Sequence, residues 1–185
     1  MMLEKTIYFL SLLFAALALA PALAHLLELL NKMKLSRDDY LTAQQIYRGW
    51  ALLGIVVFGA LISTLVLTIA VRRQRRAFIF ALLAFICIIA TQIVFWTFTY
   101  PANQATDNWT VLPENWMELR RQWEYSHAAS AGLNLLAFIS LSLSVLTRTI
   151  KPSSAKVRLE PAGRIVGPDE KAKASALERS YDSRS

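Results

Sequence analysis

Four long apolar runs constrain this chain more than any other feature. The hydrocarbon core of a bilayer is about 30 Å thick, so a helix that crosses it needs about 20 apolar residues. Runs of this length occupy residues 7–30, 50–71, 78–100 and 128–150. Backbone N–H and C=O groups find no water inside lipid, so such runs must be helical. The sequence therefore predicts an all-α integral membrane protein, built as a four-helix bundle.

Composition agrees with this fold class, because 55% of the residues are hydrophobic and the mean hydropathy is +0.38. The single cysteine, Cys87, lies inside the third run, so no intrachain disulfide can form. The net charge of +7 raises the question of a nucleic-acid partner. The basic residues form no stripe interleaved with aromatics, and we therefore expect no nucleic acid as partner.

The placement of the basic residues predicts how the chain is oriented. Short loops rich in Lys and Arg stay in the cytoplasm. The excess lies between the second and third runs and after the fourth, at Arg72, Arg73, Arg75, Arg76, Arg148, Lys151, Lys156 and Arg158. Lys32, Lys34, Arg37 and Arg48 in the first loop weaken this bias. We expect a multi-pass protein of the cell membrane with cytoplasmic N- and C-termini and a disordered basic tail at residues 151–185.

The segments on the opposite, outer side are expected to form a cap of helix and loop. Ser36 is followed by Asp39 three residues later, a variant of the capping box that opens a helix at about Arg37. Gly49 is the only breaker between that start and the second run, so the helix is expected to continue into the membrane.

The second outer segment begins as a polar, irregular loop at residues 101–113. Pro113 suits the first turn of a helix, which is predicted to run through Trp123 into the fourth run.

The N-terminus allows a second interpretation. Residues 17–24 resemble a signal-peptidase site, and cleavage after Ala24 would leave three spans. The apolar run continues to Leu30 and reaches full spanning length, which favours an intact first span.

The two histidines of the chain carry the candidate site. His25 precedes Glu28 by three residues near the outer end of the first span, and Glu124 precedes His127 by three at the outer start of the fourth. Side chains three apart share one face of a helix. Because the two spans run in opposite directions, the reversed order places both histidines at one depth and both glutamates at another.

This mirrored arrangement matches a metal site between antiparallel helices. Glu-x-x-His is a ligand motif of di-iron and di-manganese bundles, which also need glutamates from two further helices. The second and third runs contain no acid, so the set suffices for one ion of iron, zinc or manganese with open positions. A purely structural polar cluster is the alternative, with Glu28 and His127 paired to each other or to Arg120, which lies one turn before Glu124 on the same face.

Further polar residues fall on helix faces that point toward the same region. The set expected to line the site consists of Gln92, Asn103, Trp123 and Asn134. Pro21, four residues before His25, frees a backbone carbonyl and is expected to kink the first span beside the site.

Two of these segments carry a family resemblance. Pro-Ala-Leu-Ala-His at residues 21–25 and Trp-Met-Glu-Leu-Arg-Arg-Gln-Trp-Glu-Tyr-Ser-His at 116–127 resemble the anthrone oxygenase-like membrane family. The resemblance covers residues 7–150 and implies a four-helix membrane fold. The named members of that family oxidise anthrones to anthraquinones, which implies an oxygenase acting on flat phenolic molecules. Members often have an arginine shortly after the Trp-Glu pair, where this chain has His127 and Ser130.

The leading hypothesis is thus an oxidoreductase-like membrane protein with a polar site on its outer side and a small aromatic substrate. His25 and His127 are expected to act as ligands or acid–base groups, with Glu28 and Glu124 as ligands or orienting groups. Arg120 is expected to hold an anionic substrate oxygen or a glutamate. The alternative is a non-enzymatic scaffold or small transporter subunit whose polar cluster fixes the packing of the helices.

Overall fold

The computed structural model describes residues 2–148, and every regular element in that range is helical. The predicted tail at 151–185 lies outside the described residues. The elements are α1 (Met2–Lys32), α2 (Arg37–Gln44), η1 (Gln45–Tyr47), η2 (Trp50–Leu53), α3 (Gly54–Ala70), α4 (Arg75–Val94), the π-helix η3 (Phe95–Thr99), α5 (Tyr100–Ala105) and α6 (Trp116–Leu146). Within residues 2–148, each of the four predicted spans is therefore mostly helical.

Four helical segments are long and apolar enough to cross a membrane, which confirms the prediction of a multi-pass membrane protein. They are Leu3–Lys32, Trp50–Ala70, Arg75–Ala105 and Trp116–Leu146. Only 22–28% of the residues in their most apolar stretches are buried inside the protein. Their remaining apolar side chains face outward, an arrangement that suits lipid rather than water as the surrounding solvent.

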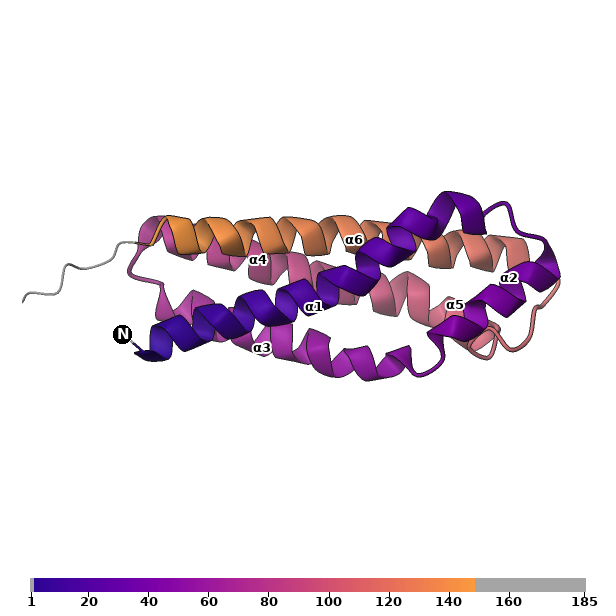
Figure 1. Ribbon diagram of the computed structural model, residues 1–185, viewed down its shortest axis with the longest axis horizontal. Helices are drawn as coiled ribbons and strands as arrows, with labels where there is room; N and C mark the ends of the chain where they lie inside the picture. The colour runs from indigo at the N-terminus through magenta and orange to yellow at the C-terminus, as the bar shows by residue number, and fades with distance from the viewer. Residues whose placement is uncertain (1, 149–185) are drawn as a thin grey trace, which may run out of the picture. The chain divides into compact units, whose positions relative to one another are not determined.

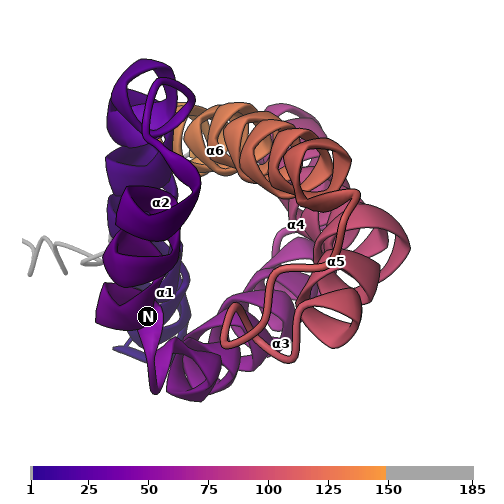
Figure 2. The same cartoon turned by 90° about the vertical axis from the view of Figure 1, so that its right-hand side faces the viewer.

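The long helices pack as neighbours in the order α1, α3, α4, α6, and α6 returns to α1 (Figure 2). The buried contacts are rich in small residues, which let helices approach closely in lipid. These are Ala15, Ala60, Ala77, Ala81, Ala84 and Ala137. Ser144 Oγ on α6 donates to the carbonyl of Ala77 at 2.9 Å and lies 3.2 Å from the hydroxyl of Tyr8. One serine therefore links three helices.

The short elements α2 and α5 gather at one end of the long helices (Figure 1). Ser36 caps α2 as predicted, because its Oγ accepts the backbone N–H of Asp39 at 3.3 Å. The predicted continuation of this helix into the second span is wrong. Gly49 adopts φ = +83°, in the left-handed region that favours glycine, and the chain turns there before η2 begins.

The prediction for residues 101–113 was wrong in its first part, since the chain stays helical to Ala105. Pro101 has no N–H for the usual backbone bond, and the π-helix η3 ends two residues before it, at Thr99. The chain then reverses through three consecutive residues with positive φ, Asp107, Asn108 and Trp109. The helix predicted to start near Pro113 is confirmed as α6, which begins at Trp116.

Gly59 provides a test of the α1–α3 contact. A Cβ atom at this position would lie 2.6 Å from Cε1 of Phe14, well inside van der Waals contact. We expect Gly59→Ala to lower the free energy of unfolding by about 1–3 kcal/mol through overpacking, measured by thermal unfolding in detergent. Gly132→Ala on α6, with no atom within 4 Å, is the matched control. If the contact is as described, adding Phe14→Ala should cost less in Gly59→Ala protein than in wild type.

Candidate functional site

The site is organised around Lys32, the last residue of α1, whose side chain is only 7% exposed. Its ammonium nitrogen lies 3.0 Å from Glu124 Oε2 and 3.6 Å from Glu28 Oε2. It also donates to His25 Nδ1 at 3.3 Å and to the Tyr47 hydroxyl at 3.2 Å. His25, Glu28 and Lys32 are spaced by three, four and seven residues, so one face of α1 presents all three. A single buried cation thus joins two carboxylates, an imidazole and a phenol.

Glu124, on α6, is the most deeply buried acid of the site, with a fully buried side chain. The Tyr40 hydroxyl donates to its Oε1 at 3.0 Å, and Gln44 Nε2 donates in turn to Tyr40 at 2.5 Å. Glu124 Oε2 has no hydrogen bond of good geometry, although the ammonium of Lys32 lies within contact distance. We regard the ion pair as the compensating interaction, because a buried carboxylate without one would be very costly.

Glu28 connects this buried pair to the surface, since 42% of its side chain is exposed. The Tyr47 hydroxyl donates to Glu28 Oε2 and accepts from Lys32. A series of contacts therefore connects the surface to the interior through Glu28, Tyr47, Lys32 and Glu124.

The two tyrosines of the site are held in their protonated form. Burial, and then the hydrogen bond to the Glu28 carboxylate, raise the pKa of Tyr47 well above its ordinary value. Burial, and then the negative charge of Glu124, do the same to the pKa of Tyr40. Both phenols therefore remain hydrogen-bond donors to the carboxylates far above neutral pH.

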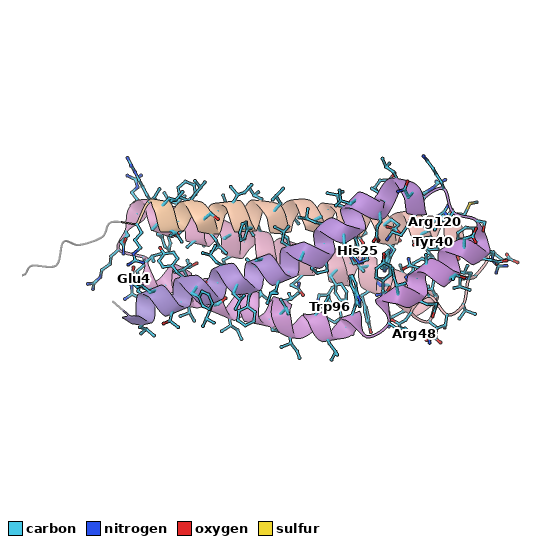
Figure 3. The ribbon with its side chains drawn as sticks, viewed as in Figure 1. Glu4, His25, Tyr40, Arg48, Trp96 and Arg120 are labelled. Carbon is cyan, nitrogen blue, oxygen red and sulfur yellow. The ribbon has the colours of Figure 1, made fainter. Side chains whose placement is uncertain are left out.

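The two histidines meet, as the mirrored spacing predicted. The rings of His25 and His127 are stacked, with centroids 4.2 Å apart and planes at 27°. Trp123 presents its edge to both of them, and Tyr47 lies 4.5 Å from His25. The Lys32 ammonium lies 4.9 Å from the ring centroid of Tyr47 and 5.0 Å from that of Trp123. Two aromatic rings thus lie close to the cation. Figure 3 shows His25 toward the end of the helices that carries Tyr40 and Arg120.

Arg120 has partners other than those expected. Its Nη1 donates to the carbonyl of Leu35 at 3.0 Å and to that of Lys32 at 3.5 Å. The guanidinium lies 4.7 Å from the ring of Trp116 and 5.3 Å from that of Tyr40. These carbonyls lie at and just beyond the end of α1, where backbone acceptors lack helical partners and a cation is favourable. Arg120 therefore caps α1, and no glutamate in residues 2–148 forms an ion pair with it.

The residues expected to line the site divide into two groups. Asn103 Oδ1 accepts the indole N–H of Trp123 at 2.8 Å and that of Trp109 at 3.2 Å, so Asn103 and Trp123 belong to the site. Asn134 instead donates to the carbonyl of Ser130 on its own helix at 2.9 Å. Gln92 donates to its neighbour Thr91 at 3.4 Å. Within the described range, neither Gln92 nor Asn134 is hydrogen-bonded to a histidine or glutamate of the site.

The metal-site prediction for His25, Glu28, Glu124 and His127 is not supported. Residues 2–148 contain no group of three or more His, Cys, Asp or Glu side chains placed to hold a metal ion. The physical reason is Lys32, whose ammonium lies between the two carboxylates and takes the Nδ1 acceptor of His25. The positive charge that a metal ion would bring to these carboxylates is already present.

The sequence prediction missed the central cation and both phenols. Lys32 was detectable, because four residues from Glu28 and seven from His25 place it on the same face of a helix that continues two residues beyond the apolar run. Tyr40 and Tyr47 lie on α2 and η1, where no local pattern indicates a contact with residues of α6 or α1.

The ion pair can be tested by a double-mutant cycle. Lys32→Met leaves Glu124 buried without a counter-charge, and we expect it to cost about 3–5 kcal/mol of stability. Glu124→Leu should cost less, because Lys32 keeps Glu28 as a partner. The double variant should be more stable than Lys32→Met alone, as measured by thermal unfolding in detergent. Purely additive losses would contradict a direct interaction between the two side chains.

The raised pKa of Tyr47 predicts a dependence of stability on pH. A phenol with an ordinary pKa of about 10 in the unfolded chain and a higher value in the folded protein stabilises the fold below pH 10. That contribution is lost as the pH rises through the folded value. We expect the unfolding temperature of wild type to fall above about pH 10 more steeply than that of Tyr47→Phe. Tyr125→Phe, at an exposed tyrosine, is the control and should follow wild type.

No protein-family model matches the chain, and neither a curated protein nor a solved structure matches it. The resemblance to the anthrone oxygenase-like family stays a prediction.

Proposed function

We propose that this chain is an oxidoreductase-like membrane protein that binds a small aromatic molecule and removes a proton from it. In this proposal the helices form a four-helix membrane bundle, and the site lies beneath a cap of helix and loop on its outer side. The N- and C-termini face the cytoplasm. The observation that carries the proposal is the burial of Lys32 between two carboxylates, beside two stacked histidines.

The energetic cost of placing ionisable side chains in membrane helices supports a functional role for this cluster. Ionisable side chains in membrane helices are rare, and those present usually mark a substrate or proton pathway. This chain gathers five of them at one end of α1 and α6: His25, Glu28, Lys32, Glu124 and His127. Small residues and hydroxyl pairs already hold the rest of the same helices together.

The hydrogen bonds distinguish the roles of the two histidines. His25 Nδ1 accepts from the Lys32 ammonium, so its Nε2 carries the proton in the neutral ring. His127 makes no hydrogen bond to any residue in the described range 2–148 and keeps an acceptor nitrogen. We assign His127 as the proton acceptor and His25 Nε2–H as a donor to a substrate oxygen. Lys32 would stabilise the negative charge that develops on that oxygen.

The second candidate function is a scaffold or small transporter subunit. Its support is that the charges of the cluster satisfy one another, since Lys32 pairs with both glutamates. Arg120 is likewise engaged with backbone carbonyls. In that case the cluster fixes the packing of α1 against α6 and turns over no substrate.

Turnover of an anthrone separates the two candidates. We expect detergent-purified protein to convert anthrone to anthraquinone in air, followed by absorbance, faster than buffer or empty detergent. His127→Gln should lower this rate by about 100-fold or more, the usual contribution of an acid–base group, without changing the unfolding temperature. Asn134→Ala, which alters a polar residue of α6 outside the cluster, should retain the wild-type rate.

Two results would count against the enzyme. The first is a wild-type rate equal to that of empty detergent. The second is a His127→Gln variant that keeps the wild-type rate. A large fall in the unfolding temperature of His127→Gln, together with no turnover by wild type, would favour the scaffold.

A further inference from the structure

A groove of about 250 Å³ runs along the surface between α1 and α3, far from the Lys32 site. Only apolar atoms line it. Its walls are Ile7, Leu10 and Phe14 on α1 and Gly59, Ile62, Ser63 and Val66 on α3.

The two helices run in opposite directions, so the walls can be ordered by depth. Ile7 and Val66 lie nearest the end where α1 begins and α3 finishes, and Phe14 and Gly59 lie deepest. Seven residues separate the first and last wall positions on each helix, which corresponds to about 10 Å. The absence of a side chain at Gly59 leaves room for the Phe14 ring at this deep end.

Exposed basic residues lie beyond the end of the groove that Ile7 and Val66 form. The α3–α4 turn carries Arg72, Arg73, Arg75 and Arg76, and all four are exposed. Arg72 follows Val66 by six residues, a rise of about 9 Å along a helix. Gln74 of the same turn donates to Glu4, which is one helical turn from Ile7. Figure 3 shows Glu4 at the opposite end of the long helices from Arg48 and Tyr40.

We propose that this groove holds one acyl chain of an anionic phospholipid whose phosphate binds the arginines of the α3–α4 turn. The chain would enter at Ile7 and Val66 and extend toward Phe14. Arginine suits this role because its planar guanidinium offers paired N–H donors to phosphate oxygens.

Charge favours a lipid over a second copy of this chain as the occupant. A symmetric dimer through this groove would repeat the same surface on both subunits. With the subunits side by side in the membrane, the two arginine clusters would face each other and repel. An anionic headgroup neutralises the same cluster instead.

Native mass spectrometry of the detergent-purified protein tests the proposal with phosphatidylglycerol and phosphatidylcholine of identical acyl chains. We expect one phosphatidylglycerol to bind wild type more tightly than phosphatidylcholine. Arg72→Gln and Arg73→Gln should each weaken phosphatidylglycerol binding by about fivefold. Arg48→Gln, an exposed arginine at the other end, should not.

A second pair of variants tests the acyl-chain groove. Val66→Trp fills the groove from its rim and should weaken the binding of both lipids. Leu65→Trp, an exposed neighbour outside the groove, should bind as wild type. Equal binding of the two lipids by wild type would overturn headgroup recognition. Unchanged binding by Val66→Trp would show that the chain lies elsewhere, and either result overturns the proposal without bearing on the enzyme.

Discussion

The buried ion pair between Lys32 and Glu124 is the interaction on which this structure most depends. It joins the last residue of α1 to the first half of α6, and it neutralises the carboxylate of Glu124, which has no access to solvent. Around it, Tyr40 and Tyr47 donate from the α2–η1 segment, so a connection between two spans becomes part of the site. Removal of the cation would leave polar groups of three elements without compensation.

The other end of the molecule is held by a different kind of contact. Alanines and serines allow α1, α4 and α6 to approach, and the hydroxyl groups bond to neighbouring backbone or to each other. Such contacts are weak individually in lipid but specify the helix positions. Among the described residues, the buried acidic and basic side chains are thus gathered at one end, while close packing of small side chains dominates at the other.

The sequence predicted the spans well because lipid imposes a simple rule on length and polarity. The His–Glu spacing also placed the two histidines together, since helical periodicity and antiparallel direction suffice for that inference. The metal assignment failed to gain support because it omitted Lys32, which lay just beyond the apolar run. The contacts of Tyr40, Tyr47 and Arg120 follow from tertiary packing and leave no periodic signal. The chemical roles of the site residues also depend on tertiary contacts, so they remain predictions.

The capping of α1 by Arg120 has a consequence for biosynthesis. Arg120 follows Lys32, whose carbonyl it binds, by 88 residues. At about 5–20 residues per second, a ribosome needs roughly 4–18 seconds to cover that distance. Throughout that interval the first span has neither its backbone cap nor the carboxylate of Glu124 for its lysine. The charged end of α1 therefore gains these partners only after α6 has been synthesised, long after α1 itself.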